Sequence, residues 1–208
     1  LDVTNVAGRS AVSVEKYKNQ AFDVILGSAK DAFNLDKEDD KVKERYGKDS
    51  IGQQLLLARR LCEFGTRFVT LHYGGWDMHG NIADALKGRV PPLDKALAAF
   101  VEDVWQRGLN EKILLIVTGE FGRTKMNKNA GRDHWPSIST LLMAGGRYDS
   151  GRVIGKADKS YTPKDNPVGP IDVAATMFDH FGIPQGIQKI DNGGRPRYLL
   201  DGEAKVIL

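Results

Sequence analysis

The sequence predicts an α/β fold built around a mainly parallel β-sheet. Three apolar runs have the composition of buried strands: TRFVTLHY at 66–73, KILLIVTG at 112–119 and TLLMAGG at 140–146. Segments with apolar residues at helical spacing separate the first two runs and follow the third. The run at 112–119 is apolar without alternation, which is typical of a strand covered on both faces, as in parallel sheets.

The first helix of this pattern is expected to start at Ser50. Ser50 is a suitable N-cap, and Gln53 three residues later completes a capping box. Arg59 then shares a helix face with the apolar Leu55, and Gly65 ends the helix.

Two further helices and a short strand are expected later in the chain. One helix should begin at Pro91 and Pro92, which a first helical turn tolerates, and end at Gly108. The other covers PIDVAATMFDHFGIP at 170–184, and GRVIG at 151–155 is predicted as a short extra strand. Nearer the amino terminus, VEKYKNQAFDVILGSAKDAF at 14–33 is predicted as a helix.

Composition indicates a soluble globular protein with a single α/β domain over residues 1–208. The chain is 41% hydrophobic and 27% charged, which is enough to bury one core. A net charge of +3 with scattered basic residues gives no reason to expect nucleic acid as a partner. The apolar run at 113–117 is far below the roughly 20 residues of a membrane-spanning helix, so no membrane span is expected. Cys62 is the only cysteine, which excludes an internal disulfide and a cysteine-based zinc site.

Polar clusters occur where ligands bind in open parallel sheets, beyond the carboxyl ends of the strands. These clusters are GGWDMHG, TGEFGRT and GRDHWP. Carboxylates and imidazoles hold divalent zinc or manganese, and neighbouring arginines bind oxyanions. The combination favours a metal-assisted hydrolase that acts on an anionic ester. The residues that the three clusters supply are Asp77, His79, Glu120, Arg123, Arg132, Asp133 and His134.

Each of these side chains also has a simpler structural interpretation. Asp77 and Asp133 are of a residue type that caps turns, and His79 fits a surface turn. Glu120 is placed to pair with Arg123. Both interpretations stay open on the sequence.

Common catalytic motifs of other enzyme classes are absent. The chain contains no G-x-S-x-G, H-E-x-x-H or G-x-G-x-x-G, which argues against ordinary serine hydrolases, zincins and dinucleotide-binding enzymes. GRVIGK at 151–156 is one residue too short for a phosphate-binding loop.

Several segments together resemble the bacterial family called domain of unknown function 1501, which is placed in the alkaline phosphatase and sulfatase superfamily. The resemblance covers about residues 40–185 and is carried by FVTLHYGGWDMHGN, PPLDKALAAFVEDVWQRGL, ILLIVTGEFGRT, GRDHWP and PVGPIDVAATMFDHFGI. It implies an alkaline-phosphatase-like three-layer α/β/α fold with metals at the carboxyl ends of strands. It also implies export to the periplasm or the extracellular space of a bacterium.

The resemblance further implies that the chain is the carboxyl-terminal portion of a longer protein. The chain begins at Leu1, and no strand before residue 50 carries the Ser, Thr or formylglycine precursor that the superfamily uses as nucleophile. We therefore expect a sheet that is incomplete on its amino-terminal side, with apolar side chains exposed there.

Metal ligands are implied by the family pattern, residue by residue. Asp77 and His79 resemble the Asp and His of one metal-binding loop, and His134 resembles the final histidine ligand. Glu120 stands where a strand-end aspartate is expected, as a metal ligand or as a group that orients a water. Phe121 replaces the histidine that should follow it, which departs from a full two-metal site.

The expected function is therefore metal-dependent hydrolysis of a phosphate or sulfate ester, with a small anionic ester as substrate. The divalent metal is expected to be zinc, with manganese or calcium as alternatives, and Arg123 and Arg132 would hold the oxyanion. The alternative is a non-catalytic binding or cell-surface assembly protein that keeps the fold, so enzymatic activity itself stays open. Neither the substrate nor the oligomeric state follows from the sequence.

Two structural expectations follow. The strands at about 67–72, 112–118 and 139–144 should be parallel neighbours in one sheet. Four side chains should converge at one end of that sheet, because the glycines beside them allow close backbone approach. They are Asp77, His79, Glu120 and His134.

Overall fold

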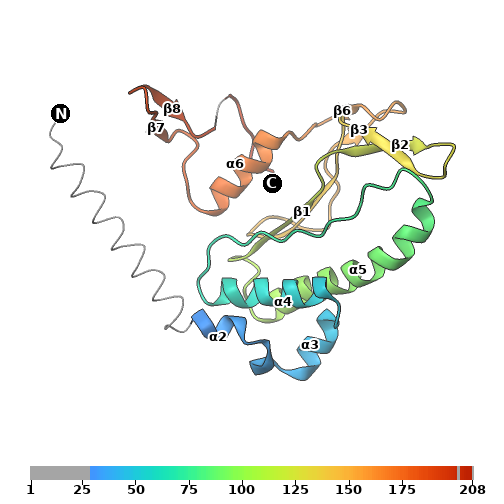
Figure 1. Ribbon diagram of the computed structural model, residues 1–208. Helices are drawn as coiled ribbons and strands as arrows, with labels where there is room; N and C mark the ends of the chain where they lie inside the picture. Colours follow the sequence, from blue (N-terminus) through green and yellow to red (C-terminus); the bar gives the residue numbers. More distant parts are fainter. Residues whose placement is uncertain (1–28, 201, 208) are drawn as a thin grey trace. The chain divides into compact units, whose positions relative to one another are not determined.

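The computed structural model describes residues 29–200 and 202–207, and Figure 1 shows their elements. Most of the helix predicted at 14–33 lies outside the described residues, and its last part forms α2 (Ala29–Phe33). The chain divides into two compact units. The first comprises residues up to Gly74 together with Arg89–Asp103, and the second comprises Gly75–Gly88 and the residues from Val104 onward. The single domain expected over residues 1–208 stays a prediction.

Where the first unit is described, its regular elements are helices. After α2 it contains η1 (Leu35–Lys37), α3 (Asp40–Tyr46), α4 (Ser50–Glu63) and the middle of α5 (Ile82–Gln106). The side chain of Asp39 caps α3 by accepting hydrogen bonds from the backbone N–H groups of Lys41 and Val42. The apolar residues buried in this unit are Ala32, Tyr46, Ile51, Leu55, Leu56, Ala58, Ala96, Ala99 and Phe100.

Helix α4 has a different start from the one predicted. The capping box of Ser50 and Gln53 is not formed, because the N-cap is Asp49, whose side chain makes no cap bond, and Gln53 donates to a preceding backbone carbonyl. Gly52 allows the chain before α4 to pack closely, since a Cβ there would lie 2.2 Å from the carbonyl oxygen of Tyr46. Backbone packing therefore defines this helix start more than a side-chain cap does.

A buried ionic network surrounds Arg59 on the packed face of α4. Its guanidinium nitrogens lie 2.5 Å from Glu38 Oε2, 2.6 Å from Glu63 Oε2 and 2.8 Å from Asp103 Oδ2. The hydroxyl of Tyr46 donates to the same Asp103 oxygen at 3.0 Å. The side chains of Arg59 and Asp103 are 1% and 4% exposed, so the charges compensate one another away from water.

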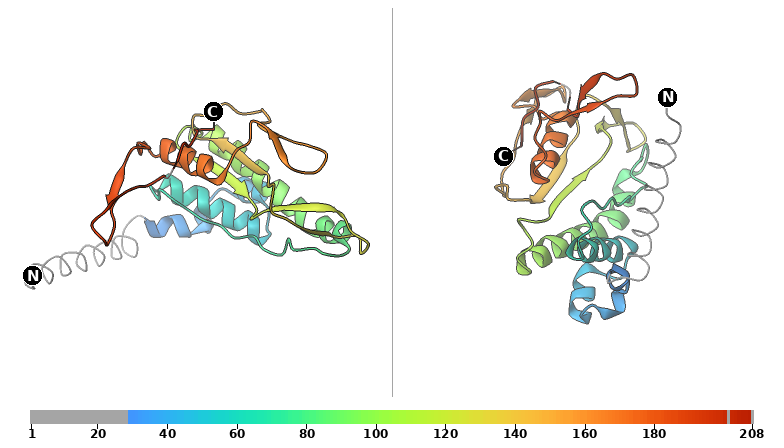
Figure 2. Two further views of the ribbon diagram at one scale, coloured as in Figure 1. Left: turned by 90° about the horizontal axis from the view of Figure 1, so that it is seen from above. Right: turned by 90° about the vertical axis from the view of Figure 1, so that its left-hand side faces the viewer.

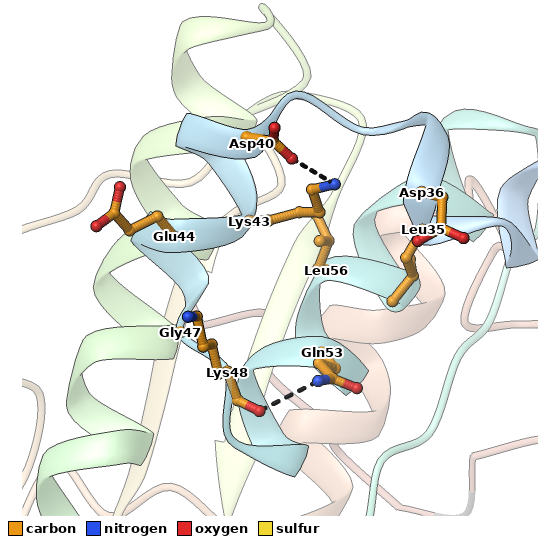
Figure 3. A pocket seen from close by; sticks show the side chains of 9 residues that line it. All are labelled: Leu35, Asp36, Asp40, Lys43, Glu44, Gly47, Lys48, Gln53 and Leu56. Atoms are coloured by element: carbon orange, nitrogen blue, oxygen red, sulfur yellow. Dashed lines mark hydrogen bonds and ion pairs between the residues drawn. The ribbon is translucent and has the colours of Figure 1, made fainter.

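A surface pocket of the first unit lies between α3 and the start of α4 (Figure 3). It contains the ion pair of Lys43 Nζ with Asp40 Oδ1 at 2.7 Å and the bond from Gln53 to the carbonyl of Lys48. These polar groups already bond to each other, which gives no reason to assign the pocket a ligand.

The prediction of a strand at 66–73 is wrong. No strand is assigned between α4 and α5, although exposed and half-buried residues alternate from Val69 to Tyr73. The side-chain pattern is that of an extended segment, but no other described segment pairs with its backbone. Phe68, expected inside, is 61% exposed.

Helix α5 begins before the prolines that were predicted as its first turn. Pro91 and Pro92 lie inside the helix, where each lacks the N–H that an interior residue donates. The predicted end is confirmed, because the helix stops at Gln106 and Gly108 follows with a φ of 65°.

The described part of the second unit contains four two-stranded antiparallel sheets and helix α6 (Pro170–His180). The first sheet joins β1 (Leu114–Thr118) to β4 (Leu141–Gly145), and the second joins β2 (Gly122–Met126) to β3 (Arg132–Trp135). The others pair β5 (Lys156–Ala157) with β6 (Pro163–Asp165), and β7 (Gln188–Ile190) with β8 (Pro196–Tyr198).

Helix α6 lies beside the β1–β4 pair (Figure 2). The hydroxyl of Tyr148, just after β4, lies 3.1 Å from the carbonyl oxygen of Thr176 and 2.9 Å from Asp179 Oδ2. The helix starts at Pro170 as predicted, with Asp172 bonding back to the N–H of Gly169. The closing helix of the prediction is thus confirmed.

The prediction of a mainly parallel three-layer α/β/α fold is wrong. The segments predicted at 112–118 and 139–144 are indeed neighbours, but they pair antiparallel, with Leu114 opposite Gly145 and Thr118 opposite Leu141. Their connection contains the β2–β3 hairpin in place of a crossover helix, so the chain turns back on itself before β4. The apolar runs at 112–118 and 139–144 were correctly predicted as strands, but the connection between them determines the direction in which they pair.

Two smaller expectations are also decided. The short strand predicted at 151–155 is wrong, because β5 begins only at Lys156 and Val153 is 94% exposed. Among the described residues, no helix is both long and apolar enough to span a membrane.

Candidate functional site

Two segments of the second unit form the candidate site, the loop at 75–81 and the β2–β3 hairpin. Backbone bonds join them: Met78 accepts from the N–H of Arg132 at 3.0 Å, and Asn81 donates to the carbonyl of Asn129 at 3.0 Å. Gly131 makes this approach possible, because a Cβ there would lie 2.0 Å from the carbonyl carbon of His79. The glycine permits the close approach, and the backbone bonds hold the loop against the hairpin.

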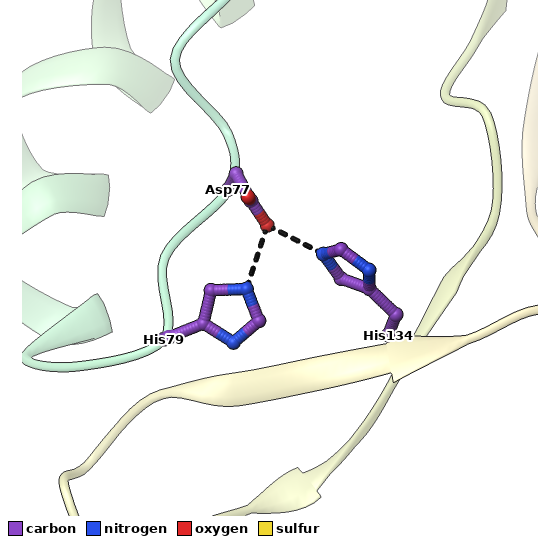
Figure 4. A group of neighbouring side chains, drawn as sticks. All are labelled: Asp77, His79 and His134. Carbon is purple, nitrogen blue, oxygen red and sulfur yellow. Dashed lines mark hydrogen bonds and ion pairs between the residues drawn. The ribbon is translucent and has the colours of Figure 1, made fainter.

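Asp77 is the centre of the site (Figure 4). Its Oδ1 atom lies 2.8 Å from His134 Nε2, 3.0 Å from His79 Nε2 and 2.6 Å from Arg123 Nη1. One ligand atom from each of Asp77, His79 and His134 lies within 4.8 Å of the others, and all three residues are exposed. The expected convergence is found for these three side chains, while their role as metal ligands stays a prediction.

Hairpin register explains how His134 reaches Asp77. His134 on β3 pairs with Arg123 on β2, and directly opposite residues of an antiparallel pair project from the same face. The ring of Phe121 lies against His134 with centroids 4.6 Å apart, and the Arg123 guanidinium carbon lies 5.5 Å from the Phe121 ring centre. Phe121, which replaces the histidine expected from the family pattern, therefore supports the ring of His134.

His79 is held from its other ring nitrogen. Its Nδ1 atom lies 2.8 Å from Asp133 Oδ1, and the side-chain amide of Asn127 donates to that same oxygen at 3.2 Å. The amide also donates to the backbone carbonyl of His79 at 3.1 Å. Hydrogen bonds with the hairpin residues Asp133 and Asn127 thus hold both the ring and the backbone of His79.

These contacts shift the pKa values of the site. Hydrogen bonding from His134, and then from Arg123, lowers the pKa of Asp77 to about 2. The bond to Asp133 raises the pKa of His79, and the same bond lowers the pKa of Asp133. Asp77 is consequently ionised at neutral pH, as a metal-binding carboxylate must be.

Glu120 and Arg132 lie outside this group. Glu120 Oε1 is 4.0 Å from Arg123 Nη2 and its side chain is 69% exposed, which fits the simpler interpretation of a pairing with Arg123. Arg132 directs Nη1 to the backbone carbonyl of Thr124 at 3.3 Å. The structure therefore brings Arg123 to the cluster and leaves Arg132 in a structural contact.

The donor set fits a divalent metal. Ligands of tetrahedral zinc at about 2.0–2.2 Å from the ion lie roughly 3.3–3.6 Å from each other. The contacts of 2.8 and 3.0 Å from Asp77 to the histidines would need to open by about 0.3–0.8 Å to reach this spacing. Arg123, which shares the same oxygen of Asp77, would have to give up part of its contact.

Two supporting residues were not found from the sequence. Asn127 lies in the turn KMNKNAGR, which carries no catalytic motif, and Phe121 was noted only as a departure from the family pattern. Their roles depend on which residues the hairpin register places together, and this pairing is not visible along the chain.

An exposed group of two imidazoles and one carboxylate, with an arginine beside it, defines a candidate divalent-metal centre. The chain belongs to the family described as Protein of unknown function (DUF1501), which matches residues 6–208. The resemblance to this family is thereby confirmed, over a longer part of the chain than the motifs alone covered. Comparison with curated proteins and with solved structures finds no match.

Proposed function

We propose that this chain provides a metal-binding site for the hydrolysis of phosphate or sulfate esters. The observation that carries the proposal is the convergence of Asp77, His79 and His134 within 4.8 Å, with Arg123 on the same carboxylate oxygen. Kinship with the alkaline phosphatase and sulfatase superfamily, and export from a bacterial cell, belong to this proposal and are supported by the sequence motifs alone.

Zinc is the metal that the donors favour. Two imidazoles and one carboxylate suit zinc, whereas calcium takes ligands that are all oxygen. Manganese is the second choice, because it accepts mixed nitrogen and oxygen ligands. When bound, such an ion supplies a Lewis acid that polarises an ester oxygen.

The chain's own residues have distinct tasks in this proposal. His79 and His134 present Nε2 atoms toward the ionised Asp77, and these three groups hold the ion. Arg123 binds the anionic group of the substrate, since its side chain is 19% exposed and its Nη1 reaches the exposed cluster at Asp77 Oδ1. Glu120, 4.0 Å from Arg123, keeps that guanidinium oriented and does not bind the metal.

A second candidate function is binding of an anionic partner without hydrolysis. The contact of 2.6 Å between Arg123 and Asp77 favours it, because this pair satisfies the carboxylate without a metal. Phe121 in the place of an expected ligand favours it as well.

Hydrolysis of p-nitrophenyl phosphate and p-nitrophenyl sulfate by the zinc-loaded chain tests the proposal. One of the two esters should be cleaved, and a chelator should abolish the reaction. His79→Ala and His134→Ala should each slow it roughly 100-fold or more, because a metal supplies several kcal/mol of transition-state stabilisation.

His72→Ala is the matched control, because His72 is an exposed histidine outside the cluster, and it should leave the rate unchanged. Equal rates in all three histidine variants would contradict the proposal. Stoichiometric zinc without hydrolysis of either ester would favour the binding function.

A further inference from the structure

The two histidines of the cluster are held in different ways. Behind His134 lies the aromatic ring of Phe121, at 4.6 Å between centroids. Behind His79 lies a carboxylate, with Asp133 Oδ1 2.8 Å from Nδ1. An aromatic ring limits how an imidazole tilts, but a carboxylate also decides which nitrogen carries the proton.

We propose that Asp133 is a positioning residue that holds His79 as the Nδ1–H tautomer and leaves Nε2 free to bind the metal. This inference rests on the proposed metal site and adds a residue to it that touches neither metal nor substrate. Asn127 supports the same arrangement, because its side-chain amide donates hydrogen bonds to Asp133 and to the backbone carbonyl of His79.

The chemistry of the pair fixes the direction of the bond. An ionised carboxylate only accepts hydrogen bonds, so Nδ1 must donate to Asp133. A neutral imidazole carries a single N–H, which leaves the lone pair on Nε2. Nε2 faces Asp77 Oδ1 at 3.0 Å as a charge contact, on the side where the metal would sit, while that oxygen accepts its hydrogen bonds from His134 and Arg123. The hydrogen bond of the His79 ring is the one from Nδ1 to Asp133. Carboxylates that bond metal-binding histidines in this way orient the ring and increase its basicity.

Asn127 cannot turn its amide around without losing these contacts. Its Oδ1 atom accepts from the backbone N–H groups of Asn129 and Gly131, each at 3.0 Å. The Nδ2 atom must therefore face Asp133 and the carbonyl of His79, where it donates two bonds. The turn thus presents a donor to Asp133 and defines the place of its carboxylate.

The same bonds decide between the two interpretations of Asp133. A turn-capping aspartate accepts from nearby backbone N–H groups. In this turn Asn127 does so, whereas the side-chain bonds of Asp133 go to His79 and to Asn127. The N–H of Asp133 itself donates to Thr124 Oγ1 at 3.0 Å, which fixes the backbone from which the carboxylate projects.

Nitrogen NMR of the histidine rings and zinc titration test this inference on the full chain. In the metal-free protein at alkaline pH, where the His79 ring is neutral, it should be in the Nδ1–H form. Asp133→Ala should remove that preference and leave the ring signals of His134 unchanged. It should weaken zinc binding by about 10–100-fold, the loss typical of residues that hold a metal ligand through a hydrogen bond.

Asp84→Ala is the matched control, because Asp84 is an exposed carboxylate of the same unit that pairs with Lys87. Asp84→Ala should change neither the tautomer of His79 nor the affinity for zinc. The Nε2–H form of His79 in the wild-type chain would overturn the inference, as would zinc affinity in Asp133→Ala equal to that of the wild type.

The ring measurement requires neither zinc nor a folded variant. If the chain hydrolyses no ester, or binds no zinc, the proposed function fails while the tautomer of His79 still decides the role of Asp133. If Asp133→Ala does not fold, as far-ultraviolet circular dichroism would show, the wild-type spectrum alone decides it.

Discussion

Two ionic clusters of this chain each pair an arginine with a carboxylate but differ in exposure. In the first unit, Arg59 and Asp103 are 1% and 4% exposed. In the second, the side chain of Asp77 is 61% exposed and that of His79 47%. The first cluster is buried, and the second is exposed, with the candidate ligand atoms of Asp77, His79 and His134 within 4.8 Å of one another.

The difference teaches that charge type alone does not identify a functional site. Charges that are buried together must satisfy each other, because removing one partner leaves the others unpaired in a medium of low polarity. Charges at the surface contribute little to stability, since water and salt screen them. The exposed cluster around Asp77 can therefore change its partners at little cost, as a binding site requires.

The largest expected effect of a substitution on stability belongs to the buried cluster. Arg59→Ala removes the buried guanidinium that Glu38 and Asp103 share and should lower the free energy of unfolding by about 3–5 kcal/mol. Urea denaturation measures this difference. The control is Arg45→Ala, which removes a more exposed pair with Glu102 and should cost about 0–1 kcal/mol. Equal losses in both variants would remove the distinction between the two clusters.

Alkaline pH should act on the same buried network through Tyr46. Burial, and then the charge of Asp103, raise the pKa of Tyr46 well above its ordinary value of about 10. The folded chain keeps the phenol proton while the unfolded chain loses it. The contribution of Tyr46 to stability is thus complete below pH about 10 and declines as pH rises towards the folded pKa, by about 1.4 kcal/mol per pH unit.

Tyr46→Phe removes this titration, so its unfolding free energy should fall less steeply above pH about 10 than that of the wild type. Urea denaturation at several alkaline pH values measures the two slopes. Tyr198→Phe is the control, because Tyr198 is 54% exposed, and it should keep the wild-type slope. A slope that Tyr46→Phe leaves unchanged would contradict the burial argument.

Much of the local structure could be predicted from the sequence, but not the way in which its parts pair. The apolar runs that became β1 and β4, and the helical spacing of α6, depend on residues close in the chain. The antiparallel pairing of β1 with β4 depends on the hairpin between them, and the segment at 66–73 has strand composition without a partner strand among the described residues. Composition indicates an extended segment, whereas pairing depends on distant segments.

The candidate site follows the same division. Asp77, His79 and His134 could be named from their residue types and from the glycines beside them. They converge for a different reason from the one predicted: the loop at 75–81 lies along the hairpin, and no parallel sheet brings the residues together. Glu120 was expected in the group because it ends an apolar strand, yet its side chain extends toward Arg123. Asn127 and Phe121 act through hairpin contacts that the sequence does not show.

Zinc titration of the chain and of Asp77→Asn, with urea denaturation of both proteins without metal, tests the central claim most directly. The substitution keeps the shape of an exposed side chain, so the unfolding curve should stay the same. Zinc should bind the wild type in a ratio of one ion per chain. Its affinity for Asp77→Asn should be lower by about 10–100-fold or more, because the loss of a residue that only supports a metal ligand already costs that much. Equal zinc affinity in both proteins, or a loss of stability like that of Arg59→Ala, would contradict the account.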